Sequence, residues 1–570
     1  MKTILFGFLS LFSFGLTAQN MIHKEVLGRP TFNSITIQTF YDQEVEVSVA
    51  YGLQSNNLDK STIWQKFAAN EPAEVVLSQL TEGTKYYYRV SYRKPLTNQV
   101  ITRPIYQFQT AKKKGVPYTF VVQADPHLDE MSDTALYSIC LRNQLEDNPD
   151  FMIDLGDFLM SDKLKNTTTK VIPKDTITYR SNLLRSFYEK VNHSVPLFIA
   201  LGNHEGEAGW LLNGTANTIP VWGTNDRKKY FTNPIPNEFY TGDTINHPFV
   251  GVRENYYSFH WGDALFIVLD PYWYTTQKPD AANGWKWTLG KGQYDWLKKT
   301  LEMSDAPFKF VFSHQLIGGA PEGRGGVEFA DLYEWGGNNQ DGTYGFTTNR
   351  PGWDKPIKEL LKEHKVSIFF HGHDHFYGKQ EKDCLIYQEC PQPSLPNFQN
   401  ANMATDYGYK EGVILPNAGH LRIQVNPEQV KVEYVRAYLP KSETSTRKNK
   451  DISATYFVQK TNCYDTITTS TSVIWNEEYS DEKIYPNPFK QDVKIHFSVT
   501  KTEHISLQIL DQEGRIVKEL IQESEIQPGV YQVDWDGKDQ YGKSVSPGNY
   551  FYLIQGQLTG QKQGKIVYID

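Results

Sequence analysis

The 570-residue sequence has only four cysteines, no excess of basic residues and no long apolar run after residue 20. No two cysteines form a C-x-x-C pair, which excludes a cysteine-based zinc or redox motif of that kind. The net charge of -8 argues against nucleic acid or an anionic membrane as an electrostatic partner. Without a later apolar run of about 20 residues, we expect no membrane span in the mature chain.

The first 20 residues read as a signal peptide. Lys2 supplies a charged start, residues 4–16 form a short apolar stretch, and Ala18 offers a small residue for cleavage. An N-terminal membrane anchor is the alternative. The signal peptide predicts export, so that the mature protein is secreted or held at the cell surface.

Export would permit disulfides. Cys384 and Cys390 bracket a short segment, so a local bridge between them and a pair of free thiols are both open. Cys140 falls in a predicted helix, where we expect a buried thiol.

Five short motifs carry the side chains that matter most for function. They are QADPH, LGD, GNHE, FSHQ and HGHDH, and each follows a run of β-forming residues or lies at its end. Residues at the carboxyl ends of strands in an open α/β sheet meet at one edge, where ligands bind. We therefore expect the motifs to line one pocket, with these metal ligands: Asp125, His127, Asp157, Asn203, His314, His373 and His375.

Carboxylate and imidazole together suit Zn, Fe or Mn, so we predict two divalent or trivalent ions. One ion would take Asp125, His127 and His375. The other would take Asn203, His314 and His373, with Asp157 shared between the two. A hydroxide held between such ions could attack phosphorus, since metal binding lowers the pKa of water to about 7.

These motifs, in this order, resemble the calcineurin-like metallophosphoesterase family over about residues 116–437. The resemblance implies an α-β-β-α sandwich and a catalytic role for His204, which would assist the leaving group or orient the phosphate. The domain order is similar to that of purple acid phosphatases. However, His127 stands where those enzymes have Gly, and Met160 stands where they have the Tyr that binds Fe(III), which argues against a coloured centre.

Four neighbouring residues have two interpretations each. Asp154 would support the His204 region or cap a strand end, and Glu205 would tune His204 or be a surface acid. His371 would contact substrate or be a strand-end histidine. Arg324 would bind a phosphate oxygen bidentately, or else be solvated or pair with a nearby Glu.

Helical periodicity in the core predicts helices over Thr134–Leu145, Arg180–Val191 and Asp354–His364. Two long stretches, Gly206–Asn255 and Gly318–Thr347, are rich in turn residues. We expect them to be loops that wall the substrate site.

The segments on either side of the core read as β modules, which the 14% aromatic content favours. Residues 21–112 contain an L-x-x-G-T-x-Y pattern ending at Tyr86, which resembles the tyrosine corner of fibronectin type III sandwiches. Residues 438–482 are polar and predict a linker.

Residues 483–570 begin with YPNPF and contain a W-D-G run followed by P-G-x-Y. They resemble the C-terminal sorting domains of type IX secretion substrates, which implies that machinery as a partner. An ordinary Ig-like sandwich is the alternative. The predicted fold class is thus multidomain, a central α/β metallophosphoesterase sandwich flanked by N- and C-terminal all-β sandwiches.

The functional hypothesis is a secreted, dinuclear-metal phosphomonoesterase acting on a phosphorylated small molecule. A phosphodiesterase with the same centre is the closest alternative, because the D-x-H form of the first motif is similar to the diesterase branch. A hydrolase of non-phosphate esters and a non-catalytic surface adhesin are the others.

Overall fold

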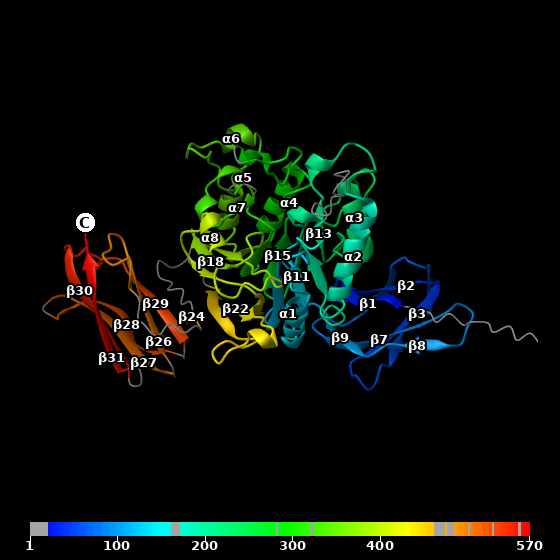
Figure 1. The fold of residues 1–570 in the computed structure, drawn as a ribbon, viewed down its shortest axis with the longest axis horizontal. Coiled ribbons are helices and arrows are strands. Elements are labelled where there is room, and N and C mark those ends of the chain that lie inside the picture. The colour runs from blue at the N-terminus through cyan, green and yellow to red at the C-terminus, as the bar shows by residue number, and fades with distance from the viewer. Residues whose placement is uncertain are drawn as a thin grey trace, which may run out of the picture.

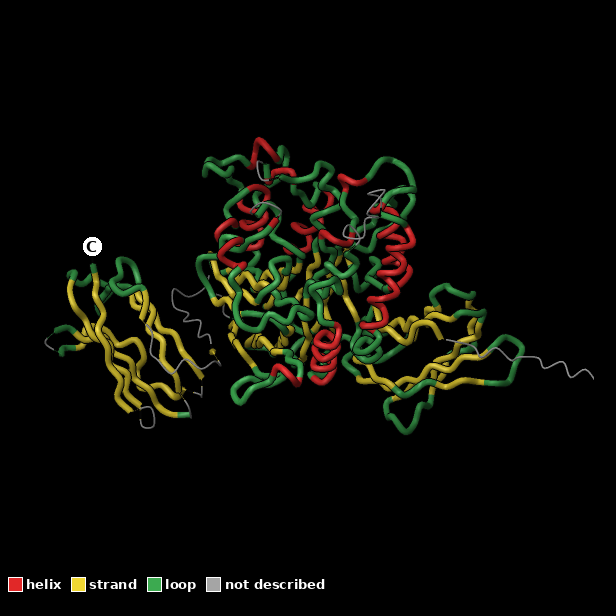
Figure 2. Tube along the Cα trace, viewed as in Figure 1, coloured by secondary structure: helices red, strands yellow, loops and turns green. Residues whose placement is uncertain are grey.

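The computed structural model describes residues 21–160, 172–280, 283–319, 323–460, 474–475, 484–499, 502–512, 514–526, 529–556 and 560–569. A central α/β domain has a β module on either side of it (Figure 1). Among the described residues the helices all belong to the central domain (Figure 2). The predicted fold class is confirmed. The predicted signal peptide, residues 1–20, lies outside the described residues.

The N-terminal module is a sandwich of two sheets. One sheet contains β1 (Met21–Gly28), β2 (Ile35–Tyr41) and β6 (Ala73–Leu77). The other contains β3 (Val45–Gly52), β4 (Lys60–Ser61), β5 (Gln65–Phe67), β7 (Lys85–Arg93), β8 (Val100–Thr102) and β9 (Tyr106–Gln109). Alternation along β7 buries every second side chain, as the sequence pattern requires. One of these, Tyr86, accepts a hydrogen bond at its hydroxyl from the backbone N–H of Thr81 at 3.0 Å.

The central domain contains two mixed sheets packed face to face. The first has β10 (Tyr118–Gln123), β11 (Phe151–Asp154), β12 (Leu197–Ile199), β21 (Gly419–Val425), β22 (Gln429–Arg436), β23 (Ile452–Gln459) and β24 (Ile474–Trp475). The second has β13 (Thr241–Gly242), β14 (Tyr257–Trp261), β15 (Ala264–Val268), β16 (Phe308–Phe312), β17 (Ile368–His371), β18 (Tyr377–Lys382), β19 (Leu385–Glu389) and β20 (Val413–Leu415). β10, β11 and β12 run parallel, and so do β15, β16, β17 and β19.

Aromatic side chains fill the space between the two sheets. Phe120 and Phe151 of the first sheet pack against Phe266 of the second, with ring centroids 5.1 and 5.2 Å apart. The outer faces are covered by helices: α1 (Thr134–Glu146) and α2 (Lys174–Tyr188) on the first sheet, and α4 (Lys291–Glu302) and α7 (Ile357–Glu363) on the second. The domain is therefore an α-β-β-α sandwich.

The three helices predicted for the core are present as α1, α2 and α7, with ends shifted by up to six residues. α1 begins at its predicted residue because the Asp133 carboxylate accepts hydrogen bonds from the N–H groups of Ala135 and Leu136. Short helices complete the domain: α5 (Tyr333–Gly336), α6 (Phe346–Asn349), α8 (Met403–Asp406) and single 3-10 turns at Asn203–Glu205, Gly209–Leu211, Gly284–Lys286, Val327–Phe329 and Pro440–Ser442.

The prediction of an uninterrupted loop over Gly206–Asn255 is wrong, because it contains the twelve-residue helix α3 (Ile219–Tyr230). The inward face of α3 carries Arg227, which is fully buried and paired with Glu207 at 2.6 Å. A charged residue at a core position interrupts the helical spacing of apolar residues from which a helix is predicted. The loop predicted over Gly318–Thr347 likewise contains α5.

The predicted linker over 438–482 is also wrong in part. β23 pairs antiparallel with β22, and its Ala454 and Tyr456 side chains lie in the core between the sheets. The polar composition of the surrounding residues concealed this one alternating strand.

The C-terminal module is a second two-sheet sandwich. One sheet has β25 (Ile484–Tyr485), β26 (Val493–Val499) and β29 (Gly529–Trp535). The other has β27 (Glu503–Leu510), β28 (Ile516–Ile526), β30 (Gly548–Gly556) and β31 (Gly560–Tyr568). Trp535 is fully buried at its centre.

Cys384 is disulfide-bonded, whereas Cys390 and Cys140 are free and buried. A bridge between Cys384 and Cys390 is therefore excluded. Cys390 follows β19 and places its thiol in the core between the sheets, away from the turn that carries Cys384. Cys140 is the buried helical thiol that was expected.

Helix α2 docks the N-terminal sandwich onto the central domain through Arg185. This fully buried guanidinium donates to the side-chain and backbone oxygens of Gln38 at 2.8 and 2.7 Å, to Lys24 O at 3.1 Å and to Tyr230 O at 2.8 Å. Burial lowers the pKa of Arg185 to about 9. Its hydrogen bonds go to neutral oxygens from both modules, and the charges of Glu189, Glu25 and Glu74 oppose the effect of burial on its pKa.

Replacing Arg185 by Met should leave these buried oxygens without donors and lower the free energy of unfolding by about 3 kcal/mol. The shift of the urea unfolding midpoint measures this loss. Arg142, exposed on α1, is the control, because its replacement by Met should change the stability by less than about 0.5 kcal/mol. Equal midpoints for the two variants would contradict the docking role.

Candidate metal centre

The structure brings all seven predicted metal ligands together at the carboxyl ends of strands from both sheets. The ligand atoms of Asp125, His127 and His375 lie within 4.8 Å of one another, as do those of Asp157, His314 and His373. Asn203 joins the second set, since its Oδ1 lies 3.1 Å from His314 Nε2. These sets agree with the predicted division between two ions.

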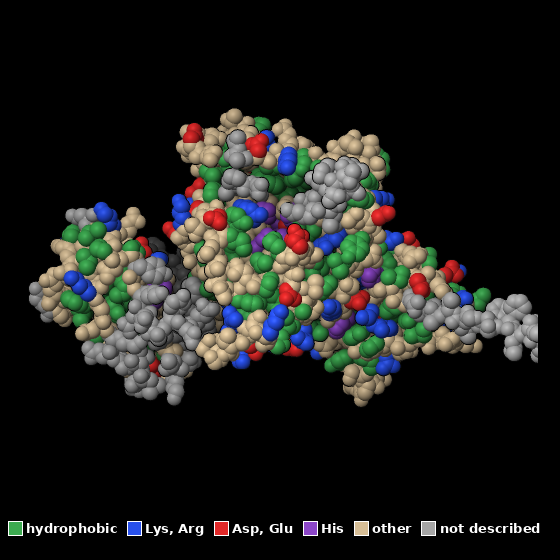
Figure 3. Space-filling model, in the orientation of Figure 1, with side chains coloured by type: hydrophobic (Ala, Val, Ile, Leu, Met, Phe, Trp, Pro, Cys, Tyr) green, Lys and Arg blue, Asp and Glu red, His purple; other side chains and the backbone are tan. Residues whose placement is uncertain are grey.

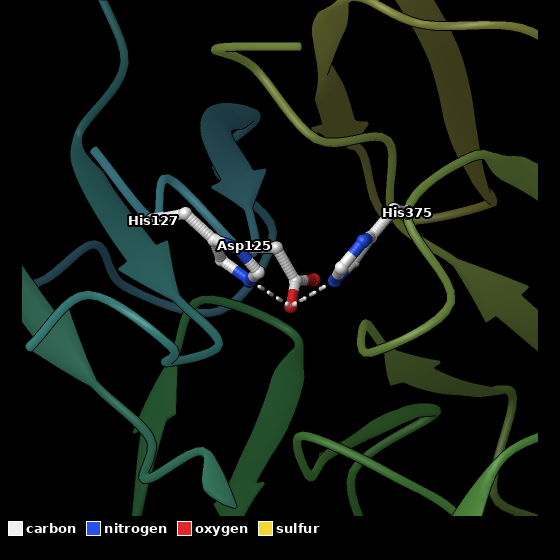
Figure 4. Close-up of side chains that lie close together, drawn as sticks. All are labelled: Asp125, His127 and His375. Carbon is white, nitrogen blue, oxygen red and sulfur yellow. Dashed lines mark ion pairs between the residues drawn. The ribbon is translucent and has the colours of Figure 1, made fainter. Parts of the chain in front are cut away.

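The first set converges on one carboxylate oxygen (Figure 4). Asp125 Oδ1 lies 3.6 Å from His127 Nε2 and 3.4 Å from His375 Nε2. Asp125 and His127 come from the loop after β10, and His375 comes from the loop after β17. Two segments some 250 residues apart are therefore joined at this oxygen.

The second set is arranged around His314. Its Nε2 lies 3.2 Å from both Asp157 Oδ2 and His373 Nδ1. The same oxygen of Asp157 lies 3.7 Å from His127 Nε2 in the first set. Asp157 thus faces both sets, which is the geometry that a shared ligand requires.

The donor atoms fit metal ions rather than a closed hydrogen-bond network. Asp125 Oδ1, His127 Nε2 and Asp157 Oδ2 are buried and have no hydrogen-bond partner within the described part of the chain. A buried polar atom without a partner costs about 1–3 kcal/mol, so its presence at three adjoining positions indicates an ion.

The charges support the same conclusion. Burial raises the pKa of Asp157, but His314 and His204 outweigh it and hold that pKa well below its usual range. Burial lowers the pKa of His314, but the Asp157 and Asp125 carboxylates outweigh it and raise that pKa to about 9. The centre therefore attracts positive charge, which protons or metal ions can supply.

Hydrogen bonds at the far side of two rings orient them. His127 Nδ1 lies 3.3 Å from Asp129 Oδ2, and His314 Nδ1 lies 2.9 Å from Leu155 O. When Nδ1 donates its proton to these oxygens, the Nε2 lone pair faces the centre.

The ligand loops adopt a backbone conformation that L residues rarely take. Five of the seven predicted ligands have positive φ: Asp125 (57°), His127 (48°), Asp157 (60°), His373 (81°) and His375 (66°). Such residues cost on the order of 1–3 kcal/mol each and persist only where the surroundings enforce them. Their clustering here marks a functional site.

Arg180 of α2 enforces two of these loops from behind. Its buried guanidinium donates to Leu128 O at 2.9 Å and to His127 O in the first loop. It also donates to Leu159 O at 2.8 Å and to Phe158 O at 3.2 Å in the loop that carries Asp157. One cation thus fixes the backbone beside ligands of both sets.

Glu205 fixes the Asp157 loop through its amides. Its carboxylate accepts hydrogen bonds from the N–H groups of Asp157, Phe158 and Leu159 at 3.0, 2.8 and 3.1 Å, and from that of Gly202. Burial, followed by the Asp157 charge, raises the pKa of Glu205 to about 7. Glu205 is fully buried, so the interpretation as a surface acid is wrong.

Glu389, at the end of β19, holds the backbone of the HGHDH loop as Glu205 holds that of the Asp157 loop. It accepts the backbone N–H of Asp374 at 3.1 Å, and its other oxygen lies 2.8 Å from His371 Nδ1. Burial lowers the pKa of His371 to about 3, so the ring is neutral. His371 therefore belongs to this support, in agreement with the strand-end interpretation.

Two motif glycines are required by close approach. A Cβ at Gly202 would lie 2.2 Å from Asp157 Oδ1, and one at Gly372 would lie 2.5 Å from Asp125 Oδ2. Any side chain at either position would displace a ligand carboxylate. The G-N-H and G-H patterns therefore follow from packing against the ligands.

The remaining predicted residues lie nearby. The backbone N–H of His204 donates a hydrogen bond to Asp157 Oδ1 at 2.8 Å. The ring Nε2 of His204 lies 3.9 Å from Asp157 Oδ2. Asp154 accepts from Gln123, from Tyr188 at 2.6 Å and from Gly156 N–H, so it supports the β11 end. Arg324 pairs with Asp374, not with a Glu.

Sequence reasoning missed Arg180 and Glu389. Arg180 shares a helix face with Leu184 and Phe187, and an arginine on an apolar face is a signal that could have found it. Glu389 ends a strand whose other residues are all buried, which is a similar signal.

Replacing Arg180 by Met should release the two ligand loops and weaken metal binding by about 10–100-fold. Competition with a chelator measures the affinity, and the absorption spectrum of the Co(II)-loaded protein reports ligand geometry. Arg185→Met is the matched control, because it removes an equally buried guanidinium of the same helix whose bonds reach no ligand loop. The idea fails if both variants bind metal as the wild type does.

Comparisons with known proteins agree with this geometry. Residues 118–377 match the calcineurin-like phosphoesterase family, and residues 484–559 match the FlgD Ig-like domain. No curated protein matches the chain. All seven predicted ligands lie within the first match.

Two solved structures share the fold. A structure of PhoD is 14% identical, with a TM-score of 0.55 over 77% of this chain and 90% of that one. The purple acid phosphatase PPD1 from yellow lupin (Lupinus luteus) seeds is 15% identical, with a TM-score of 0.51 over 79% and 78% of the two chains. The match of residues 118–377 to that family, together with the clustered donor atoms, indicates a metal-dependent phosphoric ester hydrolase.

Proposed function

We propose that the chain is a dinuclear-metal phosphomonoesterase that works outside the cytoplasm. The observation that carries the catalytic part is the single oxygen of Asp157 that faces both ligand sets, with the His204 ring beside it. Asp125, His127 and His375 would hold one ion, and Asn203, His314 and His373 the other. Zn, Fe or Mn suits these donors.

Two ions in such sites, when bound, activate water and neutralise the charge on phosphoryl oxygens. The chain's own contribution is geometric. Arg180, Glu205 and Glu389 hold the ligand loops, so the donor atoms need little reorganisation when substrate binds. Asp157 keeps its charge, because His314 and His204 hold its pKa low against burial.

His204 is the residue proposed to act on the leaving group. Its backbone is fixed by the bond to Asp157, and 13% of its side chain is exposed, so the ring edge can meet substrate. There it would donate a proton to the leaving oxygen or hold a phosphoryl oxygen.

The proposed substrates are phosphate monoesters of small molecules. The lupin protein that shares the fold is named a purple acid phosphatase, which supports this choice. A diesterase is the second candidate, because His127 makes the first motif D-x-H and lies in the first ligand set. Met160, which is buried, cannot supply a tyrosinate ligand, so no purple colour is expected.

The metal-loaded protein should contain two ions per chain and should hydrolyse 4-nitrophenyl phosphate faster than bis(4-nitrophenyl) phosphate. His204→Ala should lower turnover by about 10²–10⁴ and keep both ions, because His204 is proposed as a proton donor and not as a ligand. Elemental analysis and initial rates check this. Fewer than two ions per chain, or full activity without His204, would count against the proposed centre.

Export is the second part of the proposal. It is supported by the signal-peptide pattern of residues 1–20 and by the two β modules. The Tyr86 hydroxyl bond to Thr81 is the bond of a tyrosine corner, which supports a fibronectin type III-like module. The similarity of residues 483–570 to sorting domains points to type IX secretion machinery as the partner. Among the described residues there is no helix long and apolar enough to cross a bilayer.

Deleting residues 484–570 should leave the catalytic domain active but keep it inside the cell. Cell fractionation with the phosphatase assay measures where the activity lies. A truncated chain that reaches the medium as the full chain does would reject the sorting role and favour an ordinary Ig-like module or an adhesin.

A further inference from the structure

Arg324 lies against the metal centre without being part of either ligand set. Its Nη1 donates to the backbone oxygen of the ligand His373 at 2.5 Å and to Asp374 Oδ1 at 3.2 Å. Its guanidinium stacks on the Tyr407 ring, 4.4 Å from the ring centroid. About a fifth of the side chain is exposed.

These contacts fix the guanidinium. Asp374 is itself buried and accepts hydrogen bonds from the Tyr409 hydroxyl and the Gly325 N–H, both at 2.8 Å. The carboxylate cannot turn away, and the Tyr407 face limits tilting of the guanidinium plane. A guanidinium held in this way loses little conformational entropy when it binds a ligand.

Most of its donors remain available. Arginine has five N–H donors, and within the described part of the chain only those on Nη1 meet a protein acceptor. Nε and Nη2 form no bond there. Two adjacent N–H groups on one edge of a guanidinium match two oxygens of a phosphoryl group.

Arg324 adjoins the second ligand set, since its Nη1 contacts the backbone oxygen of His373. Arg180, a second cation close to the ligand loops, is buried and turned toward carbonyl oxygens. On the face shown in Figure 3, basic side chains lie beside histidine side chains on the central domain.

We propose that Arg324 binds the substrate phosphoryl group through Nε and Nη2 and thereby selects monoesters over diesters. This rests on the proposed function. A monoester carries nearly two negative charges at neutral pH, since its second pKa is about 6, whereas a diester carries one. A fixed cation beside the centre therefore favours the monoester, and the second organic group of a diester would compete for the space in front of it.

The test compares Arg324→Gln and Arg324→Lys with the wild type, all loaded with the same metal. Kinetics on 4-nitrophenyl phosphate and bis(4-nitrophenyl) phosphate measure specificity, titration with inorganic phosphate measures anion binding, and elemental analysis measures metal content. Arg324→Gln should lower kcat/KM for the monoester and the affinity for phosphate by about 10–100-fold, with a much smaller loss on the diester. Arg324→Lys, which keeps the charge, should fall between.

Arg93→Gln is the matched control. Arg93 also pairs with one carboxylate, Glu46 at 2.7 Å, and stacks on an aromatic ring, Trp64, at 4.3 Å, but it lies in the N-terminal sandwich. It should leave both substrates and phosphate binding unchanged.

Equal losses on both substrates, or unchanged phosphate affinity, would overturn the proposal. Loss of metal from both Arg324 variants would overturn it as well, because Arg324 would then only position His373. A wild type that hydrolyses no monoester would reject the proposed function instead. In that case the phosphate titration still decides whether Arg324 is an anion site.

Discussion

The metal centre depends on ligand loops that are held in left-handed backbone conformations by buried charges. Asp125, His127 and Asp157 have positive φ, and the strain is offset by bonds to the backbone itself. A guanidinium, Arg180, takes the carbonyl oxygens, and a carboxylate, Glu205, takes the amides. Both side chains bond the peptide unit between Phe158 and Leu159, Arg180 at its oxygen and Glu205 at its N–H. The strained loop and the two buried side chains therefore stabilise each other.

The two sheets bring the ligand loops together and exclude water from the base of the centre. Parallel strands end at one edge of each sheet, and the two edges meet because aromatic rings such as Phe120 and Phe266 pack the sheets face to face. Water is excluded from the base of the centre by the same packing. In that environment a hydrogen bond to a charged group is stronger than in water, and so Arg180 and Glu205 can hold the strained backbone of His127 and Asp157.

The sequence brought the candidate ligands to one sheet edge through short-range pattern, a strand and then a polar motif, and the flanking β modules through alternating strands. The α-β-β-α sandwich followed from the family resemblance of those motifs. It did not predict α3, β23 or the supports Arg180 and Glu389. For α3 and the two supports, a charged residue occupies a core position, as Arg227 does in α3. For β23, the polar composition of the surrounding residues concealed the strand. Glu207, the partner of Arg227, lies 20 residues earlier and outside the helix, so the pair is not recognisable until the chain folds. Pairings of this kind are tertiary information, which periodicity does not contain.

Helix α2 ties the centre to the rest of the chain. Arg180 faces the ligand loops, and Arg185, further along the same helix, faces strands β1 and β2 of the N-terminal sandwich. The sandwich is therefore part of the framework behind the metal centre and not a detached spacer. The two arginines of α2 have separable consequences, since the bonds of Arg185 reach the interface between modules whereas the bonds of Arg180 reach the ligand loops. Stability and ligand geometry are thus controlled by one helix through two different arginines.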